Sequence, residues 1–275
     1  MTFNDLPLLR SLLTLASVIE ARDPYTGGHI WRVSKYAKTL AEKAGLDKDV
    51  VFRAELGGLV HDLGKVGVAD AILSKPGKLT ESEFSVMKKH AEIGRDLISS
   101  HPMSPYVIDA IFCHHERVDG KGYPGGIMKE KLPLIAELIT VADAFDAMTS
   151  ARPYRAGMPP GKALQIIDAE KGKQFDAALA GVFLDLAGKG LLEHIIAHCG
   201  DERLMLACPK CGPVIAPPGG AADGDLISCP SCTGEFTMHA CGDVYELEPR
   251  GTMDPVRFPR PDNDTIEAFV ASVGG

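Results

Sequence analysis

Apolar residues recur at three- and four-residue intervals from residue 8 to about residue 200, and this spacing most constrains the fold. The first such stripe consists of Leu8, Leu12, Leu15 and Ile19, and comparable stripes follow along the segment. This interval places side chains on one face of an α-helix, whereas the apolar-polar alternation of a half-buried strand is absent. The segment is therefore predicted to be a bundle of helices that pack through these stripes.

A capping box is the clearest local helix signal. Thr80 is followed by Glu83, the spacing at which each side chain can bind the other residue's backbone N–H. We expect a helix to begin there and to continue through Phe84 and Met87 as far as Ile98.

The composition changes after Gly200. Residues 213–224 are rich in Pro, Gly and Ala and are predicted to form a loop, while residues 235–248 alternate weakly and are predicted to form short strands. Asp264 is predicted to cap a short final helix. We expect three regions: a helical domain over 1–200, a small β module over 201–250, and a tail over 251–275.

Composition and charge exclude several classes of protein. Hydrophobic residues make up 45% and charged residues 24%, as in an ordinary globular protein rather than a disordered one. No run approaches the ~18 apolar residues of a membrane span, and no basic segment precedes an apolar one at the N-terminus. The net charge of −8 makes binding to nucleic acid unfavourable. We therefore expect a cytoplasmic protein that binds neither membrane nor nucleic acid.

Five histidines and two aspartates lie on the inward faces of the predicted helices. They are His29, His61, Asp62, His90, His114, His115 and Asp143. A buried imidazole or carboxylate must be paired or must bind a metal, and nitrogen and oxygen ligands without thiolate suit Mn, Fe or Zn. A single histidine of this kind is more often an ordinary core residue. Seven such groups beside a Gly-rich loop indicate a metal site.

The order of these residues and the motifs around them resemble the HD-GYP family of HD-domain phosphohydrolases. The resemblance covers roughly residues 15–190. An HD pair alone is weak evidence, whereas the ordered set is specific. The matching motifs are His61-Asp62-Leu63-Gly64-Lys65, Lys75-Pro76-Gly77-Lys78-Leu79, His90 with Gly94, His114-His115-Glu116 through Gly122-Tyr123-Pro124, Asp143-Ala144-Phe145-Asp146-Ala147, Arg152-Pro153-Tyr154-Arg155 and Phe175-Asp176.

The resemblance implies a phosphodiesterase that opens cyclic di-GMP to linear pGpG, and often onward to GMP, with a water activated by two metals. The seven residues above would hold a pair of Fe or Mn ions, with Asp62 bridging the ions. Asp62 and Lys65 would carry the catalysis. The substrate-binding residues that the resemblance implies are Lys65, Gly122, Tyr123, Pro124, Arg152 and Arg155.

One position departs from part of that family. Members with three metals carry a glutamate four residues before the first histidine, and here that position is Tyr25. A neutral phenol is a poor metal ligand at pH 7. We therefore expect two ions, not three, in the catalytic site.

The C-terminal region carries two Cys-Pro-x-Cys pairs with seventeen residues between them, formed by Cys208, Cys211, Cys229 and Cys232. This spacing is typical of a four-cysteine structural zinc site, and it resembles a zinc ribbon. So small a module lacks the core to fold without a metal. A disulfide pairing and a redox role fit the sequence less well, and His239 with Cys241 remains an alternative ligand pair. We expect this zinc site and the metal site of the helical domain to hold different metals, and each to lose its metal independently of the other.

Three functions remain open. A cyclic di-GMP phosphodiesterase with an appended zinc ribbon comes first, because the Gly-Tyr-Pro loop favours it. An HD phosphohydrolase acting on another cyclic dinucleotide or nucleotide comes second. The third is a non-catalytic cyclic di-GMP sensor that contacts a protein partner through the ribbon; the loss of metal ligands would favour it, and none is lost.

Overall fold

The computed structural model describes most of the chain, and its described ranges are residues 5–23, 27–75, 77–150, 157–201, 203–212, 214–217, 220–229, 232–241, 244–252 and 262–274. Three residues of the expected site fall outside these ranges. They are Tyr25, Arg152 and Arg155.

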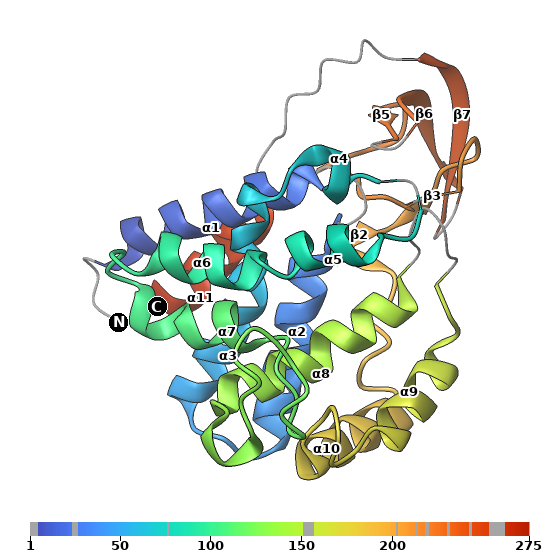
Figure 1. The fold of residues 1–275 in the computed structure, drawn as a ribbon. Helices are drawn as coiled ribbons and strands as arrows, with labels where there is room; N and C mark the ends of the chain where they lie inside the picture. The colour runs from blue at the N-terminus through green and yellow to red at the C-terminus, as the bar shows by residue number, and fades with distance from the viewer. Residues whose placement is uncertain are drawn as a thin grey trace.

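Helices make up most of the described chain, as the apolar spacing predicts. Figure 1 shows them gathered into one bundle, with the strands at one side. In chain order the helices are α1 (Leu6–Arg22), α2 (His29–Lys43), α3 (Lys48–Val60), η2 (Leu63–Gly67), α4 (Asp70–Leu73), α5 (Glu81–Met87), α6 (His90–Ile98), α7 (Ser104–Cys113), η3 (Lys129–Lys131), α8 (Leu134–Thr149), α9 (Pro160–Ala169), α10 (Ala177–Gly188) and α11 (Asn263–Gly274).

The main core lies where α2, α8 and α10 meet. Tyr36, Phe145 and Phe183 are fully buried there, and their rings meet edge to face at centroid distances of 5.1–6.1 Å. Burying one aromatic side chain contributes roughly 1.5–3 kcal/mol, and such ring pairs add to that. This core fixes α2 against α8, the two helices that carry the first and the last of the expected metal ligands.

Helix α1 buries a face that differs from the predicted stripe. Leu9, Leu12 and Leu13 are buried, whereas Leu15 is 55% exposed. The prediction that Leu15 lies on the buried face was therefore wrong, because the buried face of α1 is rotated by part of a helical turn. The physical reason is that α11 and α3 cover α1 from the side of Leu9 and Leu13, and the pattern within α1 does not show where its partners lie.

The capping box at Thr80 and Glu83 is confirmed, with both reciprocal bonds present. The helix that it begins ends at Met87, and a second helix starts at His90, so the single continuous helix was wrong. The break has a local cause. The ring of His90 donates to the carbonyl oxygen of Met87 at 2.8 Å, an acceptor that a continuing helix would use for its own backbone.

The C-terminal region forms small antiparallel sheets, as the weak alternation predicts. Their strands are β1 (His198–Gly200), β2 (Arg203–Leu204), β3 (Leu206–Ala207), β4 (Val214–Ile215), β5 (Leu226–Ser228), β6 (Gly234–Cys241) and β7 (Val244–Thr252). β1 pairs with β2, β3 pairs with β4, and β5, β6 and β7 form one sheet in that order. Strand β4 lies within residues 213–224, so that segment is not wholly a loop as predicted.

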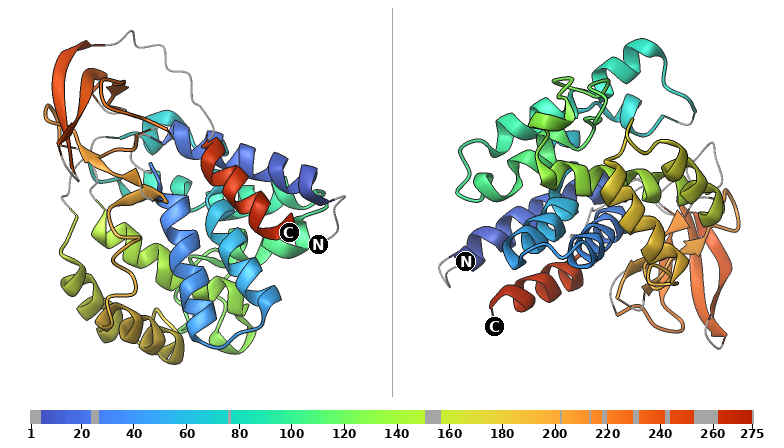
Figure 2. Two further views of the ribbon diagram at one scale, coloured as in Figure 1. Left: turned by 180° about the vertical axis from the view of Figure 1, so that it is seen from behind. Right: turned by 90° about the horizontal axis from the view of Figure 1, so that it is seen from below.

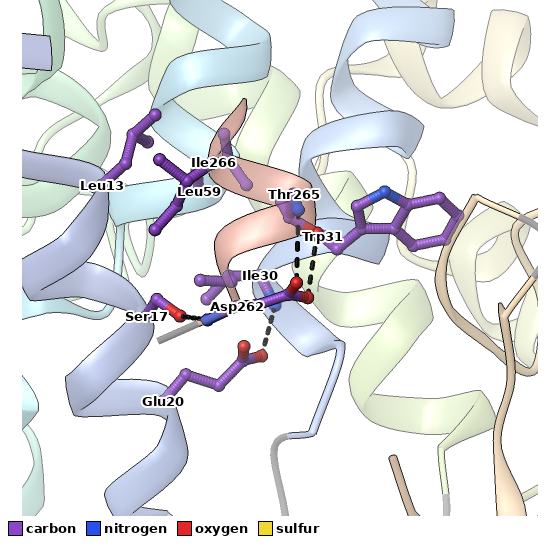
Figure 3. Close-up of a pocket in the computed structure, with 9 residues that line it drawn as sticks. All are labelled: Leu13, Ser17, Glu20, Ile30, Trp31, Leu59, Asp262, Thr265 and Ile266. Atoms are coloured by element: carbon purple, nitrogen blue, oxygen red, sulfur yellow. Dashed lines mark hydrogen bonds between the residues drawn. The ribbon is translucent and has the colours of Figure 1, made fainter. Parts of the chain in front are cut away.

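The final helix exists as predicted, but its cap is a different residue. Asp262, not Asp264, accepts the backbone N–H of Thr265, because the helix begins at Asn263. Figures 1 and 2 show α11 lying beside α1, although the two are the last and first helices of the chain. Figure 3 shows the contact region, where the backbone N–H of Asp262 donates to the hydroxyl of Ser17 and the backbone N–H of Ile30 donates to Glu20.

Among the helices that the structure describes, none has the length and apolar character needed to cross a lipid bilayer.

Candidate metal centre

The structure brings all seven expected ligand residues to one place, where the ends of α2, α3, α6 and α7 meet the middle of α8. Six of them form two groups, and Asp62 is the seventh. His29, His61 and Asp143 offer ligand atoms within 4.8 Å of one another, and so do His90, His114 and His115. Each group has the size of a single metal site, so the cluster as a whole can hold two ions.

Asp62 lies between the two groups and faces both. Its Oδ2 atom is 3.6 Å from Nε2 of His29 and 3.5 Å from Nε2 of His61. Its other oxygen, Oδ1, is 3.6 Å from Nε2 of His90, a member of the second group. Asp62 therefore offers one carboxylate oxygen to each histidine group.

Three of the histidines are aimed by their own local backbone. The Nδ1 atoms of His61, His90 and His114 donate to the carbonyl oxygens of Gly58, Met87 and Ala110 at 2.8–2.9 Å. This bond places the proton on Nδ1 and leaves Nε2 as a lone-pair donor that points into the cluster. The Nε2 atom of His61 is buried and has no hydrogen-bond partner, which is costly unless a metal or water fills the place.

His29 is aimed instead by a buried carboxylate. Its Nδ1 lies 2.7 Å from Oδ2 of Asp146, and Asp146 in turn accepts from Arg32 at 2.5 and 3.1 Å. Asp146 is 1% exposed and Arg32 is 2% exposed. A carboxylate behind a metal-binding imidazole orients the ring and raises its basicity.

Charges in the cluster set the protonation of its members. Burial lowers the pKa of His61, His90 and His114, and it lowers the pKa of His115 to about 3. These rings are therefore neutral at pH 7, the form that binds metal. Burial alone would raise the pKa of Asp62, but Lys65 and the surrounding histidines hold it well below its usual range.

His29 and Asp146 shift together. Burial lowers the pKa of His29, but the hydrogen bond and charge of Asp146 outweigh burial and raise it overall. Burial raises the pKa of Asp146, while the positive charge of Arg32 and the bond to His29 bring it well below its ordinary value. The result is a carboxylate that stays ionised behind the ring.

Lys65 lies at the edge of the cluster. Its Nζ is 2.8 Å from Oδ2 of Asp62 and 3.2 Å from Oδ2 of Asp23, so its charge is held beside the bridging carboxylate. The residue before it in the motif, Gly64, is required by space, because a Cβ there would overlap the carbonyl oxygen of His90. The His-Asp-Leu-Gly-Lys turn therefore sits directly against the start of α6.

The Gly-Tyr-Pro loop packs against His115 of the second histidine group. The ring of Tyr123 lies 4.7 Å from that of His115, centroid to centroid, and Gly122 passes so close to Glu116 that a Cβ would overlap its Cα. Glu116 is fully buried, and it accepts the backbone N–H groups of Gly125 and Ile127 at 2.6 and 3.0 Å. Two such bonds fix the loop's path beside the metal cluster.

Sequence reasoning missed the supporting residues Asp146, Arg32 and Glu116 as parts of the site. A usable signal existed for two of them. Asp146 follows Asp143 by one helical turn within an apolar run, and Arg32 follows His29 by three residues on an otherwise apolar face. Charged residues are rarely buried unless they are paired, so the two together indicated an internal ion pair.

The four cysteines of the two Cys-Pro-x-Cys pairs also converge. The Sγ atoms of Cys208 and Cys232 are 3.7 Å apart, those of Cys211 and Cys229 are 3.5 Å apart, and all four lie within 4.8 Å of one another. Four thiolates around one point suit a tetrahedral structural zinc. Cys113 and Cys199 are buried elsewhere, and Cys241 is exposed outside this group.

Comparison with known proteins gives one family match. The HD domain family model matches residues 14–179, more than half of the chain and nearly the stretch in which the motifs lie.

Curated relatives match more than half of the chain. The cyclic di-GMP phosphodiesterase response regulator RpfG of Xanthomonas campestris is 41% identical over 201 residues, which are 72% of this chain and 52% of RpfG. The 3'3'-cGAMP-specific phosphodiesterase 3 of Vibrio cholerae is 40% identical over 154 residues, 55% of this chain and 33% of that protein. The chain thus spans about half or less of these relatives' length.

Solved structures agree on the fold. A cyclic GMP-AMP-specific phosphodiesterase of V. cholerae superposes with a TM-score of 0.51 at 15% identity, covering 68% of this chain and 50% of that one. At this identity the likeness concerns the fold alone.

Proposed function

Because the chain belongs to the HD domain family, we propose that it is a metal-dependent phosphodiesterase that hydrolyses a cyclic dinucleotide, cyclic di-GMP first among them. One observation carries the proposal: Asp62 offers one oxygen to each of two histidine groups. Relatives named as cyclic di-GMP phosphodiesterases support the substrate class. The expected products are linear pGpG and, after a second cleavage, GMP.

The ligands proposed for the two ions are the seven clustered residues. Their imidazoles and carboxylates fit Fe or Mn, and the unpartnered Nε2 of His61 supports a metal there. A bound pair of ions would lower the pKa of a water and stabilise charge on the phosphate.

Other roles fall to the chain's own side chains. Asp62 bridges the two sides, and Lys65 is placed to hold a phosphate oxygen once substrate draws it from Asp62. Gly122, Tyr123 and Pro124 form the lip that contacts substrate. We also assign phosphate binding to Arg152 and Arg155, and this assignment rests on the sequence motif alone.

The second candidate substrate is a hybrid cyclic dinucleotide. The observation that favours it is that relatives up to 40% identical are named as 3'3'-cGAMP-specific phosphodiesterases. A sensor without activity is less well supported, because every proposed ligand is present and the cluster is complete.

The expected result of a substrate panel is metal-dependent cleavage of cyclic di-GMP. Protein purified without oxygen, stripped with EDTA and reloaded with Mn²⁺ or Fe²⁺ is mixed with cyclic di-GMP, 3'3'-cGAMP or cyclic di-AMP, and products are separated by chromatography. The stripped protein is the matched control and should be inactive. Faster cleavage of 3'3'-cGAMP would assign the second candidate, and no cleavage of any of them by the loaded protein would overturn the proposal.

Metal counting gives a separate prediction. We expect two Fe or Mn ions and one Zn per chain, since Tyr25 replaces the carboxylate that a third ion would use. Elemental analysis of the purified chain measures both metals at once. Three non-zinc ions at full occupancy would contradict the prediction, and Tyr25→Glu is the variant expected to gain one.

A further inference from the structure

The open end of the β3–β4 hairpin packs against the turn that precedes His29. Its tip is the first cysteine pair, Cys208 to Cys211, which joins the two strands. Met205, just before β3, places Sδ 2.8 Å from Nη1 of Arg32. Ala216, just after β4, packs on Gly27, where an added Cβ would lie 2.8 Å from the methyl group of Ala216. Both ends of this hairpin thus contact the turn and first helical turn that carry His29.

Arg32 connects the hairpin to the metal centre. Its Nη1 also donates to the carbonyl oxygens of His198 and Gly27 at 2.8 and 3.2 Å, while its Nε and Nη2 bind Asp146. Asp146 holds Nδ1 of His29. A continuous set of three contacts therefore runs from Met205 through Arg32 and Asp146 to a metal ligand.

The contacts of Arg32 depend on where the β3–β4 hairpin lies. The guanidinium of Arg32 is buried and keeps its charge at any physiological pH, so each of its N–H groups needs an acceptor. The strands β3 and β4 pair through only two residues each, and Leu206 and Ile215 pack with a few apolar residues of β5 and β6 in a cluster too small to hold the hairpin rigidly without further support. The four cysteines supply the missing constraint when they bind a metal.

We propose that the four-cysteine module positions the catalytic ligand His29: metal bound by the cysteines fixes the β3–β4 hairpin, the hairpin fixes Arg32, and Arg32 orients His29 through Asp146. The inference rests on the proposed function of the seven-residue histidine and aspartate cluster as a metal site, which we call the front site. It replaces the expectation that the two metal sites fail separately. Coupling between sites is reciprocal, so loading either site strengthens metal binding at the other.

A pair of small substitutions tests the contact directly. Gly27→Ala introduces a methyl group against Ala216 and should lower the affinity of the front site for Mn²⁺ by about tenfold, the lower range for loss of a supporting contact. Gly27→Ala combined with Ala216→Gly removes the clash and should restore the affinity to within about twofold. The matched control is Gly181→Ala, where an added Cβ meets nothing within 4 Å. Affinity is measured on the full chain by competition with a fluorescent chelator.

A second variant tests the cysteine end. Cys229→Ser should release about one Zn per chain and lower front-site Mn²⁺ affinity in the same competition assay, with KM for substrate less affected than kcat. Unchanged front-site affinity in Cys229→Ser, or failure of Ala216→Gly to rescue Gly27→Ala, would overturn the proposal. Because the readout is metal affinity, a chain that binds Mn²⁺ yet cleaves no cyclic dinucleotide would refute the proposed function and leave this coupling standing.

Discussion

Asp62→Ala is expected to lose bound metal and hydrolysis together. The substitution removes the only carboxylate that faces both histidine groups within the described cluster, and it leaves the two groups with no shared ligand. A bound metal pair supplies several kcal/mol of transition-state stabilisation, so turnover should fall by about 10³-fold or more. Elemental analysis and the rate of cyclic di-GMP cleavage measure the two effects on one preparation.

The control for this variant is Asp168→Ala on α9, an exposed aspartate whose side chain is 62% accessible and pairs with Lys171. It should keep both metals and full activity. Turnover by Asp62→Ala close to that of the unaltered chain would refute the two-metal assignment.

Asp146→Ala is expected to weaken the fold as well as the site. It leaves Arg32 as a buried cation without its carboxylate, a change that costs about 3–5 kcal/mol in other proteins. It also frees the ring of His29. We expect a lower midpoint in urea unfolding of the apo chain together with reduced affinity for Mn²⁺. An unfolding midpoint equal to that of the unaltered chain would contradict the assignment of a buried ion pair.

The same pair predicts how stability depends on pH. The pKa of Asp146 is lowered on folding, so its ion pair contributes fully above the unfolded carboxyl's pKa of about 3.9 and loses its contribution as acid protonates it. The stability difference between the unaltered chain and Asp146→Asn should therefore begin to shrink only below about pH 4, as the pH falls towards the depressed pKa of Asp146 in the folded chain. Urea titrations of both proteins across that range measure it, and a difference that grew on acidification would reverse the sign of our argument.

Local pattern predicted much of the fold, because helical spacing and capping are local properties. The Thr80 capping box and the strands after residue 234 need only neighbours in sequence, and both are present. The face of α1 could not be predicted, since it depends on α11, more than 240 residues away, which packs on Leu9 and Leu13. The break before His90 depends on a side chain taking a backbone acceptor, which spacing does not reveal.

The site shows the same division. The seven residues expected to bind metal converge in the structure. The sequence could predict this because a buried histidine or aspartate needs a polar partner or a metal. The supports of those residues were missed, because Arg32 and Glu116 look like ordinary charged positions until the fold buries them. The contact of Ala216 with Gly27 joins two small residues with no chemical signature. Only the three-dimensional arrangement reveals that contact.

The bonds from His61, His90 and His114 to carbonyl groups three or four residues earlier in the chain have a further thermodynamic consequence. Each ring is confined to one rotamer when its turn forms, and this loss of side-chain entropy, on the order of 1 kcal/mol per residue, belongs to folding and not to ion uptake. The folded chain therefore meets an ion with preorganised donors and little left to rearrange. Selectivity among divalent ions should then follow the intrinsic preference of nitrogen and oxygen donors, and the supply of each metal in the cell would decide which ion is found there.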